Sequence, residues 1–266
     1  MNWIKTVYIW HDCFLVRTSN VALVFDFWKD PYQHGPLPNP LMVLDREMPV
    51  YVFVSHGHKD HYNPGIFNWS QYFRNIHYVV SKDVMKRIKH IIMPDSSYKG
   101  VKVDASRVIA MRADESYEDD IVKVRSFAST DIGNSYAVEV DGYSIFHSGD
   151  LNAWLWKDES TDQEVRKALG DFNSIVTEIS EVYEGFDLCF FPVDSRIGRD
   201  YFTGAKIFLK KFKIENFFPM HYELGEDTTS IARLHRDAAA FECYASPTCR
   251  HYIMSASYSA YVWYGK

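Results

Sequence analysis

The amino-acid sequence predicts an α/β fold of the four-layer αββα type, in which two sheets pack face to face with helices outside. The runs 50–54 and 187–193 are rich in β-branched and aromatic residues, as expected of strands that are buried on both faces. Helix-like stretches at 81–91 and 203–212 follow strand-rich regions. Groups of strands that are each closed by helices are typical of such a layered sandwich.

The N-terminal half is predicted to open with an antiparallel meander that leads into the core. Its strand-like stretches cover residues 4–10, 13–17, 21–27, 50–54, 76–80 and 107–111. Pro64 favours a short helix from residue 63 to about Trp69, and Ser81 and Asp83 favour a cap for a helix that ends near Ile91. The proline-rich residues 29–48 form a long loop, which is either a pocket wall or plain surface.

The C-terminal half repeats the alternation of strands and helices. Asp141-Gly142 is a strong hairpin signal, and candidate interruptions of a helix lie at Gly170 and Asn173. Strands are predicted at 121–127, 135–140, 143–147, 187–193 and 215–218, and helices at 161–182, 203–212 and 227–240. The tail 249–263 holds two strand-like runs that we expect to pair at a sheet edge.

Composition limits the classes of partner. Hydrophobic residues make up 47% and aromatic residues 16% of 266, which is ample for a sizeable core. The formal net charge of −6 provides no overall basic field, so neither nucleic acid nor a membrane is expected as a partner. The four cysteines include no Cys-x-x-Cys pair, which argues against a disulfide scaffold or a thiolate zinc site. With no signal peptide or apolar span visible, we expect a cytoplasmic location.

The stretch from Ser55 to His61 directly follows the apolar run 50–54 and carries three imidazoles and a carboxylate. A loop at the end of a buried strand is a place where side chains converge on one point. Neutral imidazole nitrogens and carboxylate oxygens are ligands that zinc and its first-row neighbours prefer. The alternative is a polar loop whose histidines lie at the surface or support other groups.

The spacing His56-x-His58-x-Asp60-His61 resembles the His-x-His-x-Asp-His motif of the metallo-β-lactamase superfamily. Two later segments, 144–150 with its Gly-Asp and 217–221 with its terminal histidine, resemble the family's further motifs in order and spacing. Among the branches, the chain is most similar to the compact ascorbate-phosphate-lactonase-like hydrolases. This resemblance implies a single domain over residues 1–266 and the αββα sandwich.

The resemblance also implies a metal centre with two neighbouring sites. The first takes two motif histidines and a mid-chain histidine, the second takes the motif aspartate and two histidines, and one carboxylate bridges them. In this chain the implied ligands are His56, His58, Asp60, His61, Asp150 and His221. The implied activity is that of a hydrolase in which a metal-bound hydroxide attacks an ester, lactone, amide or phosphoester of a small molecule, with Asp60 orienting the nucleophile. Zinc is the default metal, as one or two ions, and Mn or Fe is compatible.

The chain departs from the family pattern at the mid-chain histidine. The corresponding loop, 127–133, contains no histidine. Asp131 is the candidate oxygen donor in its place, or Ser129 or Thr130 holds a water that binds the metal. The second site is complete by sequence, so at least one metal is expected there.

Several neighbouring residues are candidates for supporting roles. Asp26 is expected to orient a ligand imidazole, while His11 is either such a support or a turn residue. His147 is expected to pack in its sheet or to support Asp150. Trp154 and Trp156 either pack or line an apolar pocket, and Asp194 and Arg196 either orient substrate or pair with one another.

Three other functions compete with hydrolysis of a small molecule. A non-catalytic metal-binding member of the family is consistent with the missing histidine. A phosphodiesterase or nuclease would need a basic surface, and a di-iron redox protein would normally need a flavin partner. The substrate, the physiological metal and the oligomeric state are left open by the sequence.

Overall fold

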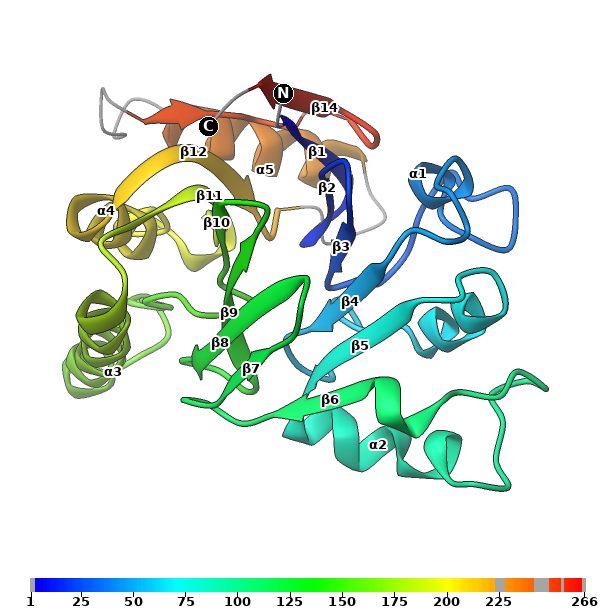
Figure 1. The fold of residues 1–266 in the computed structure, drawn as a ribbon. Coiled ribbons are helices and arrows are strands. Elements are labelled where there is room, and N and C mark those ends of the chain that lie inside the picture. The colour runs from blue at the N-terminus through cyan, green and yellow to red at the C-terminus, as the bar shows by residue number, and fades with distance from the viewer. Residues whose placement is uncertain (1–2, 223–227, 242–248, 255, 265–266) are drawn as a thin grey trace. The chain divides into compact units, whose positions relative to one another are not determined.

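A computed structural model describes residues 3–222, 228–241, 249–254 and 256–264 of the chain. It divides into two compact units (Figure 1). The first unit comprises residues 1–112, 119–121 and 256–266, and the second comprises residues 113–118 and 122–255. In the described residues each unit contains one seven-stranded mixed sheet with its own helices.

The sheet of the first unit has the strand order β14-β1-β2-β3-β4-β5-β6. Strands β14 to β3 pair antiparallel, and β3 to β6 pair parallel. The bounds are β1 Trp3–Trp10, β2 Cys13–Arg17, β3 Ala22–Phe25, β4 Val50–Val54, β5 Ile76–Ser81, β6 Val108–Met111 and β14 Ala260–Tyr264. Its helices are α1 Asn39–Met42, α2 Lys82–Ile92 and the 3₁₀ helices η1 Pro64–Gln71 and η2 Ala105–Arg107.

The sheet of the second unit has the order β13-β12-β11-β10-β9-β8-β7. Here β13 to β10 run parallel, and β10 to β7 form an antiparallel meander. The bounds are β7 Ser116–Glu118, β8 Val122–Ala128, β9 Asn134–Val140, β10 Tyr143–His147, β11 Gly185–Pro192, β12 Lys213–Met220 and β13 Arg250–His251. Its helices are α3 Asp162–Val182, α4 Thr203–Lys211, α5 Thr228–Ala240 and the 3₁₀ helix η3 Ser195–Ile197.

Each unit has a separate hydrophobic core between its sheet and its helices. In the first unit, Val52 of β4 and Val80 of β5 are fully buried with Val84 and Ile88 of α2. In the second unit, Phe146 of β10 stacks on Phe208 of α4 with ring centroids 4.9 Å apart. These cores hold the parallel strands rigidly, and the predicted site residues follow the carboxyl ends of those strands.

Most of the predicted elements are present, and the structure adds detail to three of them. The helix α3 is uninterrupted, because its capping box at Thr161 and its buried face outweigh the roughly 1 kcal/mol that Gly170 costs in a helix. The short helix expected after Asn63 is present, and it is the 3₁₀ helix Pro64–Gln71 with Asn63 as its N-cap. The two tail runs each pair at a sheet edge, but in different sheets, since β13 joins the second sheet through β12 and β14 joins the first through β1. The described part of the predicted helix 227–240 begins at Thr228.

Candidate metal centre

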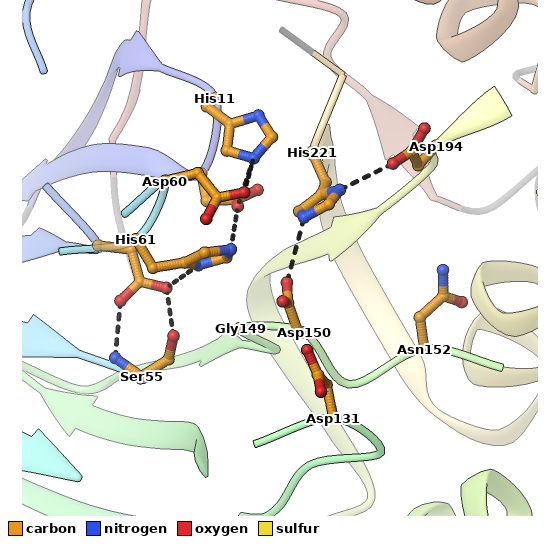
Figure 2. Close-up of polar contacts among 12 residues, drawn as sticks. His11, Ser55, Asp60, His61, Asp131, Gly149, Asp150, Asn152, Asp194 and His221 are labelled. Carbon is orange, nitrogen blue, oxygen red and sulfur yellow. Dashed lines mark hydrogen bonds and ion pairs between the residues drawn. The ribbon is translucent and has the colours of Figure 1, made fainter. Parts of the chain in front are cut away.

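The motif loop of the first unit starts where β4 ends, and an aspartate from the neighbouring strand holds its start. Asp26 directly follows β3, which pairs parallel with β4. The Ser55 backbone N–H donates to Asp26 Oδ1 at 2.7 Å, and the Ser55 hydroxyl donates to Asp26 Oδ2 at 2.6 Å (Figure 2). Asp26 has φ of 43°, a left-handed conformation that turns the chain sharply after the strand. The loop therefore leaves the sheet in a fixed direction.

Three motif imidazoles gather beyond this anchor. His61 Nδ1 lies 2.9 Å from Asp26 Oδ2, and His56 Nδ1 lies 3.0 Å from the Ser55 hydroxyl. The ring of His56 is 4.1 Å from that of His61 and 4.6 Å from that of His58, measured between centroids. The expected hydrogen bond between Asp26 and a motif histidine is confirmed. Tethering Nδ1 leaves Nε2 as the nitrogen that can bind a metal.

Asp60 and the β1–β2 turn complete the polar cluster of the first unit. Asp60 Oδ2 lies 3.8 Å from His11 Nε2, and the Asp60 side chain remains 27% exposed while His11 is buried. His11, Asp12 and His61 each offer a ligand atom, and these atoms lie within 4.8 Å of one another. Sequence reasoning treated His11 as a possible support and missed Asp12, which adjoins it. A polar pair at a hairpin tip is ordinarily a surface feature, so the sequence carried no signal for its burial.

In the second unit, Asp150 and His221 follow two strands of the parallel part of the sheet, β10 and β12. The Nε2 atom of His221 lies 3.3 Å from Asp150 Oδ1 (Figure 2). His147, at the end of β10, is buried and its Nδ1 accepts the Gly149 N–H at 3.2 Å, so it supports the turn into Asp150 as expected. The structure thus brings together two predicted ligands that are far apart in sequence.

Asp194 orients His221 in the same way that Asp26 orients His61. It follows β11, the parallel neighbour of β12, and its Oδ2 lies 2.9 Å from His221 Nδ1. The Arg196 guanidinium pairs with the same carboxylate. Burial raises the pKa of Asp194, but hydrogen bonds from His221 and Arg196 outweigh burial and lower the pKa to about 2. Of the two roles considered for Asp194 and Arg196, the structure shows the pairing.

The loop that lacks a histidine is held to the chain after Asp150 by Thr130. The Thr130 hydroxyl donates to the Asn152 carbonyl at 2.6 Å and accepts the Asn152 N–H at 3.1 Å. The Ser129 hydroxyl accepts the Asp131 N–H at 3.3 Å. Asp131 and Asp150 offer carboxylate oxygens within 4.8 Å of each other. Of the three candidates on this loop, Asp131 thus brings an anionic oxygen beside Asp150, while the Thr130 hydroxyl bonds to backbone.

Trp154 packs against the second-unit residues of the site. Its indole N–H donates to the Asp150 carbonyl at 2.8 Å, and its ring lies edge-on to His221 with centroids 5.3 Å apart. Trp154 and Trp156 stack in parallel at 6.5 Å. The tryptophan therefore fixes both the backbone at Asp150 and the face of the imidazole.

The donor set fits a divalent first-row metal. Three predicted ligand histidines, His56, His61 and His221, have Nδ1 tethered by a hydroxyl or a carboxylate. Such a tether favours the tautomer in which Nδ1 carries the proton and Nε2 is the donor atom for a metal, as metal-binding histidines require. Carboxylates adjoin the imidazoles in both units, and they supply negative charge to balance a dication.

Comparisons with known proteins agree on the fold. A family model described as "Beta-lactamase superfamily domain" matches residues 5–176. The metallo hydrolase Igni18 from the archaeon Ignicoccus hospitalis KIN4/I is similar in structure, with a TM-score of 0.63, 15% identity, and coverage of 99% of this chain and 100% of that one. The metallo-beta-lactamase fold protein YhfI from Bacillus subtilis has a TM-score of 0.59 and 12% identity, with both chains covered completely, at 100%. The predicted fold class is confirmed.

A further structural neighbour differs in its described activity. CmlA, a diiron beta-hydroxylase from Streptomyces venezuelae, has a TM-score of 0.61 and 12% identity, and the match covers 98% of this chain but 54% of that one. A search of curated proteins found no match. At these identities the structural likeness concerns the fold alone. Among the described residues, no helix has both the length and the hydropathy needed to cross a bilayer.

Proposed function

The chain belongs to the beta-lactamase superfamily, and on that premise we propose that it is a metal-dependent hydrolase of a small-molecule ester, lactone, amide or phosphoester. One observation carries the proposal. Three histidines at predicted ligand positions have Nδ1 held by a hydroxyl or a carboxylate, which leaves Nε2 as the nitrogen that would bind a metal. A fold shared with hydrolases does not determine the substrate, so the bond class is stated broadly.

We assign the metal ligands as the family resemblance implies, with Asp131 in the place of the missing histidine. The first site takes His56, His58 and Asp131, the second takes Asp60, His61 and His221, and Asp150 is shared. Bound metal would lower the pKa of a water and polarise the scissile group. A mixed nitrogen and oxygen donor set accepts zinc, manganese or iron.

The chain's own residues supply orientation and proton transfer. Asp60 is the partly exposed carboxylate of the cluster, with 27% of its side chain accessible, so it is suited to orient a water and to take its proton. Asp26 and Asp194 hold the imidazoles of His61 and His221 in one orientation. Such fixed geometry is what an efficient attack on the substrate requires.

A second function is favoured by one feature, the loop 127–133 without a histidine. In that alternative the chain binds one metal tightly and catalyses no hydrolysis. The two alternatives predict different behaviour on a generic substrate panel, although both predict bound metal.

The experiment combines metal analysis with a panel of esters, lactones, amides and phosphoesters, and with Asp60→Ala. We expect purified protein to contain metal and to hydrolyse at least one member of the panel. Asp60→Ala is expected to lower kcat by about 10³-fold or more with the fold retained, because a ligand and the orienting group are lost together. Asp45→Ala, at an exposed position of the same unit, is the matched control. Full turnover by Asp60→Ala would contradict the mechanism, and metal without turnover on any substrate would favour the non-catalytic alternative.

A further inference from the structure

The turn between β1 and β2 is buried although it consists of two polar residues. Trp10 pairs with Cys13, so His11 and Asp12 alone connect the strands. Hairpin tips normally face water, where their polar groups are solvated. Here both side chains have no exposed surface. A buried carboxylate needs a positive partner or a metal, because desolvation of an isolated charge is costly.

Asp12 lies on the side of His61 that faces away from Asp26. Its Oδ2 atom is 3.1 Å from His61 Nε2 and 3.2 Å from His11 Nε2. His61 Nδ1 meanwhile lies 2.9 Å from Asp26 Oδ2 (Figure 2). One imidazole is therefore placed between two carboxylates.

The protonation state of His61 determines whether this arrangement of charges is favourable. A neutral imidazole carries a single N–H, and donation from Nδ1 to Asp26 leaves a lone pair on Nε2. A lone pair that faces a carboxylate oxygen at this distance is repulsive unless a cation binds both atoms. Without a cation, the contact requires a proton, either on the Asp12 carboxyl or on Nε2 as a doubly protonated imidazolium between two carboxylates.

We propose that Asp12 is an additional oxygen ligand of the metal that His61 binds, a ligand outside the six that the family motif implies. His11 is the positioning residue, since its Nε2–H is within reach of the Asp12 carboxylate. The inference rests on the proposed metal-dependent function and adds to it a preference among metals. An extra carboxylate favours the harder cations Mn²⁺ and Fe²⁺ relative to a site in which imidazole dominates.

The test uses the full chain after removal of metal, titrated with Mn²⁺ and separately with Zn²⁺ against a chromophoric chelator. Asp12→Asn keeps the shape of the side chain and removes its charge. We expect it to weaken Mn²⁺ binding by at least tenfold and Zn²⁺ binding by less, which is the scale of effect for groups around a metal. Asp45→Asn, exposed and in the same unit, is the control and is expected to bind both metals like the wild type.

Thermal unfolding of the metal-free proteins separates this role from a structural one. If Asp12 is a ligand, Mn²⁺ should raise the Tm of Asp12→Asn less than it raises the Tm of the wild type, because the variant has lost a charged oxygen donor. If Asp12 only pairs with a His61 imidazolium, the substitution lowers the Tm of the metal-free protein and leaves the metal affinities equal to wild type. That result would overturn the inference.

A second variant keeps the test informative if Asp12→Asn does not fold. Asp12→His offers nitrogen in place of oxygen, and we expect it to shift the preference from Mn²⁺ towards Zn²⁺. An unchanged ratio of the two affinities would also overturn the inference. Failure of the proposed function has different signatures: without a metal centre the wild type itself would bind neither metal in the titration, and a non-catalytic protein would bind metal but hydrolyse no member of the substrate panel.

Discussion

Each unit of the molecule uses an aspartate to hold a histidine, and the two pairs balance the buried charge differently. In the first unit Asp26 follows β3 and holds His61, while in the second Asp194 follows β11 and holds His221. Asp26 also accepts hydrogen bonds from the neutral backbone and hydroxyl groups of Ser55. Asp194 instead pairs with the Arg196 guanidinium. The same orienting task is thus compatible with neutral donors or with a cation around the carboxylate.

The two units therefore differ in what a substitution of the orienting aspartate would disturb. Asp26 connects the motif loop to the sheet through Ser55, so it supports both an imidazole and the backbone. Asp194 sits at the start of the short helix η3, where its carboxylate accepts the Arg196 N–H at 3.0 Å. Its charge is compensated locally, and its influence is confined to His221 and the adjoining turn.

The largest expected effect comes from giving the loop of the second unit an imidazole. We expect the unmodified protein to retain about one metal per chain after mild chelation, because the first site lacks its third histidine. Asp131→His should raise the retained metal towards two, as measured by elemental analysis after dialysis against a weak chelator. Thr130→His is a poorer choice, since the Thr130 hydroxyl bonds to Asn152. Two equally tight metals in the unmodified protein would contradict the expectation that the first site, with a carboxylate in place of its third histidine, is the weaker one.

A smaller effect is expected when the orienting carboxylates are exchanged for amides. Asp26→Asn and Asp194→Asn should each weaken the binding of Zn²⁺ by about 10–100-fold, because a misplaced imidazole binds metal poorly. We expect the larger loss for Asp26→Asn, which also weakens the hydrogen bonds to Ser55. Competition with a chelator gives both constants under the same conditions. Equal losses, or a larger loss for Asp194→Asn, would contradict the difference that we draw between the units.

The smallest expected effect is on stability in acid, and it concerns the metal-free protein. Folding lowers the pKa of Asp194 from 3.8 to about 2, so the unfolded chain binds more protons between these values. The stabilisation is complete above pH 3.8 and is lost as the pH falls towards 2. Its size is about 2 kcal/mol. Urea unfolding with a chelator present should show this loss in the wild type and not in Asp194→Asn. If the free energies of unfolding of the two proteins changed with pH in the same way, Asp194 would not be the source of the loss.

Much of the fold could be predicted because the strands carry strong local signals. The run 50–54 is apolar throughout and is fully buried as β4. Asp141 and Gly142 have φ of 49° and 82°, as their hairpin signal predicts. By contrast β7, Ser116–Glu118, is an edge strand of three residues in which a half-buried Tyr117 lies between two exposed residues, and three residues are too few to show a period of two. This strand is stabilised by its pairing with β8. Such pairing cannot be recognised from the local sequence.

The motif residues of the site could be predicted from the sequence, but the residues that orient them could not. The histidines and aspartates of 56–61 form a dense local pattern, whereas the pairing of Asp194 with His221 depends on β11 and β12 being neighbours in the sheet. Nothing local distinguishes Asp194 from a turn residue. Asp12 was missed for a related reason, since its burial follows from tertiary packing that a two-residue turn does not encode.

The pairing of β14 with β1 has a consequence for biosynthesis. Residues 3–7 at one edge of the first sheet pair with residues 260–264, which the ribosome adds only after the entire second unit. During translation the emerging β1 strand therefore has an open edge, and an open strand edge is a template for pairing with other nascent chains. Lys5 on β1 disfavours such association, because a charged side chain on an edge strand opposes pairing with another chain. The sheet of the first unit is thus begun first and completed only after the second unit has been synthesised.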